Sequence, residues 1–166
     1  MSLIESSFSE TIHPIDLVEH LAEHNDWEFD RVGDDQIAMA VVGQWRTYSI
    51  TLAWSDYDET LRLICTFEME PPQNKLAEIY ELLNHANDQC WTGAFSYWDE
   101  QKMMVYRYGL PLSGGQIASP EQIDRLIGSA VGNAERFYPA FQLVAWSDQS
   151  PKEAMDVAIN EAYGRA

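Results

Sequence analysis

The sequence predicts an α+β fold in which an antiparallel sheet of about six strands packs against helices. Segments with an apolar residue at every second position fall into two groups, four in a row and then a pair. Helical spacing of apolar residues precedes the first group, separates the two groups, and occurs twice after the second. The resulting order, α-ββββ-α-ββ-α-α, lacks the strand–helix alternation of a parallel α/β sheet.

The first helix is expected to begin at Pro14, because proline suits the first turn of a helix, and to end at Asn25-Asp26. Its apolar face consists of Ile15, Leu17, Val18, Leu21 and Ala22. Residues 1–12 are expected to form a variable, poorly ordered lead, and residues 13–166 a single domain.

Short turns rich in Gly, Asp and Ser join the first four strands into a meander, with strands at 27–32, 36–42, 45–54 and 60–69. The two prolines of "EPPQ" stop the last strand, since proline cannot donate a hydrogen bond to a ladder.

The second half of the chain is expected to hold a helix, a hairpin and two further helices: 73–91, 94–98 with 103–110, a helix from Pro120, and one from Pro151 to about Tyr163. Pro139 lies inside the helix from Pro120, so a kink or a break is expected there.

Charge is the unusual feature of the composition. The chain has 27 acidic and 10 basic residues, a formal net charge of −17. This balance argues against binding to nucleic acid or to an anionic membrane, because both need a basic face. Two interpretations remain: a hydrated surface that keeps the protein soluble, or an acidic binding protein that holds a sticky client or a basic partner.

The sequence predicts a cytoplasmic protein. Cys65 and Cys90 lie in apolar segments, which is typical of free buried thiols in a reducing compartment. The first residues, "MSLIESSFSETIH", have no basic residue and no sustained apolar run, so no secretory signal is expected. No segment has the roughly 20 apolar residues of a membrane-spanning helix.

A zinc-protease pattern, H-x-x-E-H, occurs at "HLAEH", where it would make His20 and His24 ligands of a catalytic metal. The two histidines share a helix face, but this face lies opposite Val18 and Leu21 and should point to water. Two solvated histidines are therefore the better interpretation, and no metal is predicted.

A Cys–His nucleophile is the second catalytic pattern considered. Cys90 would need surroundings that favour a thiolate, yet it lies near the C-terminus of its helix, where the dipole opposes an anion. His85 lies five positions earlier and faces another direction. The sequence therefore predicts no enzyme, no catalytic residue and no cofactor.

Asn84 and Asn87 are unusual inside a helix, because Asn is a poor helix former. We interpret them as amides that cap frayed carbonyls where the helix meets Trp91-Thr92-Gly93. A hydrogen bond between subunits is the alternative.

Trp45 and Trp98 fall outside the most apolar strand faces. They either occupy core or helix-covered positions or mark a binding surface. The candidate partner surface consists of Trp45, Trp98, Tyr80 and Asn87.

Three stretches resemble the YbjN family of bacterial proteins: "HPIDLVEHLAEHNDWEFDRVGDDQIAMAVVGQWRTYSITLAW", "AEIYELLNHANDQCWTGAFSYW" and "ERFYPAFQLVAWSDQSPKEAMDVAI". The resemblance spans about residues 13–162. It implies a fold like that of type III secretion chaperones, compact, often dimeric and without a catalytic site. Members are loosely described as regulators of sensory transduction, and no residue-level role carries over.

The sequence and the resemblance together predict a non-enzymatic protein-binding module, chaperone-like or regulatory, that forms a homodimer. It would hold an unidentified client or regulator in a groove or as a strand added to a sheet edge. The alternative is a sensory protein that binds a small ligand between the sheet and helices 120–163.

Overall fold

The computed structural model describes residues 12–164, with side chains for residues 12–160. In this part of the chain, six strands form one open antiparallel sheet and four α-helices accompany it. The α+β class and the order of elements predicted from the sequence are confirmed. Residues 1–11 of the expected lead lie outside the described residues.

The helices are α2 (Pro14–His24), α3 (Leu76–Asp88), α4 (Pro120–Trp146) and α5 (Pro151–Gly164), with a short 3-10 helix, η1 (Gln73–Lys75), before α3. The strands are β1 (Glu28–Gly33), β2 (Gln36–Val42), β3 (Thr47–Ser55), β4 (Thr60–Glu68), β5 (Ala94–Trp98) and β6 (Met103–Pro111).

The strand order across the sheet is β1-β2-β3-β4-β6-β5. The first four strands follow the predicted meander, while the hairpin enters the sheet through its second strand. Cys65 of β4 therefore lies opposite Tyr106 of β6, and β5 forms the edge.

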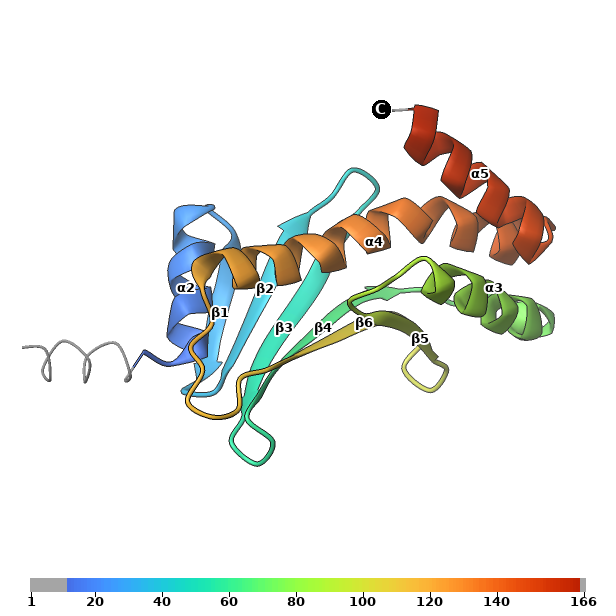
Figure 1. Ribbon diagram of the computed structural model, residues 1–166. Helices are drawn as coiled ribbons and strands as arrows, with labels where there is room; N and C mark the ends of the chain where they lie inside the picture. The colour runs from blue at the N-terminus through green and yellow to red at the C-terminus, as the bar shows by residue number, and fades with distance from the viewer. Residues whose placement is uncertain (1–11, 165–166) are drawn as a thin grey trace, which may run out of the picture.

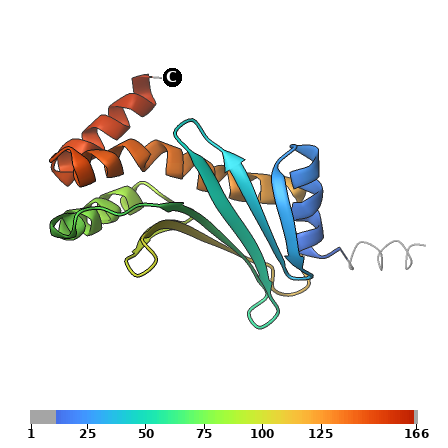
Figure 2. The same ribbon diagram turned by 180° about the vertical axis from the view of Figure 1, so that it is seen from behind.

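Helices cover only one face of the sheet. In Figure 1, α4 passes in front of the strands, and in Figure 2 the strands lie in front of α4. Alternate strand residues point to α2 and α4 and are buried, among them Ile37, Met39, Tyr48, Ile50, Leu52, Leu61, Leu63, Cys65, Phe67 and Tyr106. We call the opposite side, which no helix of the described chain covers, the open face.

The long helix α4 links the two ends of the molecule. It begins with a capping box, in which the Ser119 hydroxyl accepts from the Gln122 N–H and the Gln122 side chain accepts from the Ser119 N–H. Its first half packs on the sheet beside α2, and its second half packs with α3 and α5 (Figure 1). The break considered at Pro139 does not occur, since one helix continues to Trp146. Buried Phe137, Ala140 and Phe141 on both sides of the proline hold the two halves against the same core.

Candidate binding site

A carboxylate on α4 holds the loop between β2 and β3. Oε1 of Glu135 accepts a hydrogen bond from the Tyr48 hydroxyl at 2.7 Å and from the Trp45 N–H at 3.3 Å, and Oε2 accepts from the Gln44 N–H at 3.0 Å. Gly43 permits this approach, because a Cβ there would collide with the carboxylate and lie 2.6 Å from the Tyr48 ring. Burial, and then the bond to Glu135, raise the pKa of Tyr48, so its hydroxyl remains a donor.

The anchored loop places an indole and a guanidinium beside α4. The Trp45 ring stacks on Tyr138 with centroids 6.5 Å apart, and its side chain stays exposed. The Arg46 guanidinium lies 5.5 Å from the centroid of Phe67 and 5.9 Å from that of Tyr138. Its Nη1 donates to the Glu68 carbonyl at 2.9 Å, while its Nε is buried and has no hydrogen-bond partner among the described residues.

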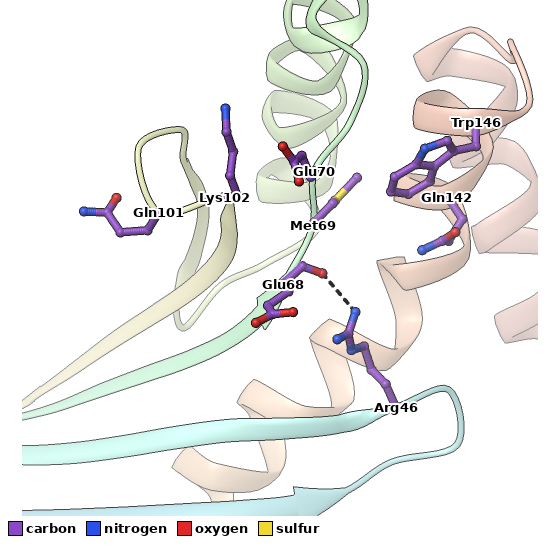
Figure 3. Close-up of a pocket in the computed structure, with 8 residues that line it drawn as sticks. All are labelled: Arg46, Glu68, Met69, Glu70, Gln101, Lys102, Gln142 and Trp146. Carbon is purple, nitrogen blue, oxygen red and sulfur yellow. Dashed lines mark hydrogen bonds between the residues drawn. The ribbon is translucent and has the colours of Figure 1, made fainter.

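A cavity of about 550 Å³, the α4 pocket, opens beside this arginine. Figure 3 shows its lining side chains, which come from the β2–β3 loop, the end of β4, the β5–β6 turn and α4: Arg46, Glu68, Met69, Glu70, Gln101, Lys102, Gln142 and Trp146. Residues Tyr138, Gln142 and Trp146 are four positions apart along α4 and so share one helix face. Trp146 is 51% exposed although it is a large apolar side chain.

The charges around the α4 pocket are mixed. The Lys102 ammonium pairs with Asp99 at 2.9 Å, and this hydrogen bond raises the pKa of Lys102. Arg46 has no carboxylate partner in the described part of the chain, although Glu68 and Glu70 line the same pocket. None of the eight lining residues is a Ser, Cys or His. The arrangement offers hydrogen bonds, charge and aromatic contact, which serve binding.

The family model of YbjN, described as "Putative bacterial sensory transduction regulator", matches residues 14–143. The chain belongs to the YbjN family. A similar solved structure is the "Crystal structure of YbjN, a putative transcription regulator from E. coli", with a TM-score of 0.52, 10% sequence identity, and coverage of 81% of this chain and 90% of that chain. At 10% sequence identity, the similarity to this structure supports the fold of the chain alone. No curated protein matches the chain.

In this YbjN family member, the candidate partner surface does not form one site, because Trp45 lies apart from Trp98, Tyr80 and Asn87, which lie on β5 and α3. Trp45 lies beside the α4 pocket, Trp98 is a half-buried residue at the end of β5, and Tyr80 is exposed on α3. Arg46 and Trp146 were not among the residues predicted from the sequence. The four-residue spacing from Tyr138 was a visible signal for Trp146, but it lies in an apolar stretch that resembles core.

The helix-capping role expected for Asn87 is wrong. Its Oδ1 accepts from the Phe95 N–H at 2.7 Å and its Nδ2 donates to the Phe95 carbonyl at 3.1 Å. The side-chain amide of Asn87 therefore bonds the outward N–H and carbonyl of Phe95, as the backbone of a neighbouring strand would. It can do so because α3 lies along the β5 edge of the sheet. Asn84, one turn earlier, is exposed.

The histidines of the H-x-x-E-H pattern, His20 and His24, are both exposed on α2, as expected. Among the side chains of residues 12–160, no three of His, Cys, Asp or Glu are grouped so as to hold a metal ion. In the same range, no helix combines the length and the apolar character needed to cross a membrane.

The thiols differ in burial, and this corrects the expectation that both are buried. Cys65 is buried, and burial raises its pKa to about 12. Cys90 is half-buried, and burial raises its pKa against the opposing effect of Arg136.

We expect neither thiol to react quickly at pH 8 in the folded protein, because the reactive species is the thiolate. Iodoacetamide labelling followed by mass spectrometry should show no modification of Cys65, slow modification of Cys90, and rapid modification of both in urea. Rapid labelling of native Cys90 near pH 7 would instead revive a thiol-dependent activity.

Proposed function

We propose that this protein is a non-enzymatic regulator that binds a segment of a partner protein at the α4 pocket. The observation that carries this proposal is that Arg46 and Trp146 line one cavity, while the stacked rings of Trp45 and Tyr138 lie beside the arginine. Residues that dominate protein–protein binding energy are enriched in Trp, Tyr and Arg and flank pockets in this way. The family description as a regulator supports the same class of function.

The lining of the pocket favours a polypeptide over a small apolar molecule. Its volume lies within the range of small-molecule sites, but such sites are mostly apolar. Here Met69 and Trp146 are the apolar residues among eight that line the cavity. Glu68, Glu70 and the net charge of −17 favour a segment with basic residues, and the Trp146 ring can hold a cation by its face. A small polar ligand is the second candidate, supported by the cavity of about 550 Å³ between the sheet and α4.

Groove binding fits the sheet edges better than strand addition. At the β5 edge, Asn87 already bonds both backbone groups of Phe95. At the end of β1, the Arg31 side chain bonds the carbonyls of Gly33 and Asp34, and it also pairs with Asp16 of α2. Edges occupied by their own side chains resist the pairing of a further strand.

The proposal includes a cytoplasmic location and a homodimer. The free thiols of Cys65 and Cys90 support a reducing compartment.

Trp146→Ala is expected to weaken partner binding at least tenfold, because removal of a central hot-spot residue costs about 2 kcal/mol. Trp91→Ala is the matched control, since Trp91 is 97% exposed and lies outside the pocket lining. Tagged wild type and both variants would capture proteins from lysate under crosslinking. The candidate partner would then be purified and titrated calorimetrically against each.

Retention of the partner by wild type and Trp91→Ala, with loss by Trp146→Ala, supports the α4 pocket. Equal affinity of all three proteins would exclude it. Binding of a metabolite to wild type, competed by no protein, would favour the small-ligand candidate.

A further inference from the structure

The open face has few charges, although solvated sheet faces are usually polar. Its composition follows from the register, which aligns residues in rows across the strands. One row is Asp30, Ala38, Thr51, Ile64, Arg107 and Ala94, and the next is Glu28, Ala40, Ser49, Thr66, Val105 and Ser96. Between the acidic residue at β1 and the arginine at β6, the side chains are small or β-branched and uncharged.

Four of the five charged strand residues on this face are separated by sign, and the fifth, the acidic Glu68, lies at the end of β4. Glu28 and Asp30 lie on β1, at one side of the sheet. Arg62 of β4 and Arg107 of β6 lie towards the other side, and they are diagonal neighbours because Arg62 faces Gly109 and Arg107 faces Ile64.

The two arginines line a hollow of about 630 Å³, together with small or uncharged side chains such as Thr60, Ser96 and Ala94. Gly109 keeps it open by having no side chain opposite Arg62. Arg62 bonds Asp58 at 2.8 Å, but Arg107 has no ion pair or hydrogen bond among the described residues. An exposed guanidinium without a partner is notable in a chain with 27 acidic residues.

We infer that two copies of this protein pair through their open faces, so that Asp30 of each protomer meets Arg107 of the other. In the sheet order, β1 is first, β3 third and β6 fifth, so β1 and β6 lie at equal distances on either side of β3. A two-fold axis parallel to β3 therefore lays β1 of one copy over β6 of its partner. Asp30 and Arg107 lie in the same row, so the pairs form without a shift along the strands. Stacked sheets lie about 10 Å apart, which brings the small side chains between these charges into contact.

A second copy fits this face because each chain carries an acidic residue, Asp30, and a basic residue, Arg107, that are too far apart to pair within one chain. β1 and β6 are four strand spacings apart, roughly 19 Å. A two-fold interface uses the same surface twice, so two such pairs form at once. The α4 pocket, at the helix-covered side, stays open in this dimer, so the inference does not depend on the partner proposed for that pocket.

Charge reversal and exchange test the inference. Arg107→Glu alone and Asp30→Arg alone should each raise the dimer dissociation constant at least about tenfold, because like charges then face each other. An equimolar mixture of the two variants should dimerise again, since one native and one exchanged pair form. The double variant Asp30→Arg/Arg107→Glu should do so by itself. Sedimentation velocity at several concentrations, in about 0.15 M salt to screen long-range repulsion, measures all four proteins.

Arg125→Glu is the matched control, because Arg125 is exposed on α4 at the helix-covered side. It should leave the dimer unchanged, and circular dichroism should show that every variant is folded. A monomeric wild type at tens of micromolar, a dimer that ignores both reversals, or a mixture that stays monomeric would each overturn the inference. A monomeric wild type that loses an acidic partner on Arg107→Glu would assign the open face to another protein.

Discussion

Glu135→Ala is expected to lower the free energy of unfolding by about 3 kcal/mol, since a hydrogen bond to a charged group contributes about 1.5–3 kcal/mol and three are lost. The Tyr48 hydroxyl carries most of this effect, because Tyr48 is fully buried and its donor would lose the carboxylate that accepts from it. The N–H groups of Gln44 and Trp45 are exposed and can bond to water instead.

Urea unfolding followed by tryptophan fluorescence measures this change. Glu135→Gln should cost about half as much, because one oxygen still accepts while the amide nitrogen cannot. Tyr48→Phe removes the buried donor, and a double-mutant cycle with Glu135→Ala isolates the coupling between the two side chains. A loss below 0.5 kcal/mol for Glu135→Ala, at the level of ordinary surface substitutions, would contradict the anchoring role.

Glu135→Gln should also impair the α4 pocket. Trp45 and Arg46 are held beside α4 by the loop that Glu135 bonds. Partner binding should therefore fall in Glu135→Gln even where the protein remains folded. This result would link the local hydrogen bonds to recognition.

Most elements could be predicted because their signals are local. The bounds of β2, Gln36–Val42, and the start of α4 at Pro120 coincide with the sequence prediction. Period-two apolar patterns, turn residues and the Ser-Pro cap each act within a few residues. The insertion of β6 between β4 and β5 could not be derived in this way, since it is decided by which strand of the hairpin pairs with β4.

The α4 pocket was not predictable for the same reason. Gln44 and Glu135 are 91 positions apart, and Glu135 is one of 27 acidic residues. Nothing near Glu135 in the sequence distinguishes a carboxylate that anchors a loop from one that faces water. Trp45 could be identified as a candidate because it lies off the apolar faces, but its neighbours Tyr138 and Trp146 depend on the position of α4.

Pro139 shows how packing overrides a local signal. A proline inside a helix removes the hydrogen bond to the carbonyl four residues earlier, here that of Glu135. The helix nevertheless continues, because Phe137 and Phe141 contact the same aromatic residue, Phe95, from opposite sides of the proline. Their burial stabilises the helix on both sides of the missing bond.

Asn87→Ala is expected to lower the free energy of unfolding by about 2–3 kcal/mol, because it removes two hydrogen bonds and leaves the Phe95 N–H and carbonyl without their partners. Asn84→Ala is the matched control, since the same chemical change is made one helical turn away at an exposed position. It should cost nothing measurable, or stabilise slightly through the higher helix propensity of alanine.

Amide hydrogen exchange separates the role of Asn87 at the sheet edge from a general loss of stability. The Phe95 N–H is bonded to Asn87, whereas the N–H groups that pair β5 with β6 are bonded within the sheet. In Asn87→Ala, Phe95 should lose protection far more than Val105 or Arg107 of β6, which face Ser96 and Ala94 of β5. A uniform loss across β5 and β6 would mean that Asn87 supports the packing of α3 rather than the strand edge. A selective loss would show that this side chain substitutes for a seventh strand, so that its removal should also expose β5 to pairing with another chain.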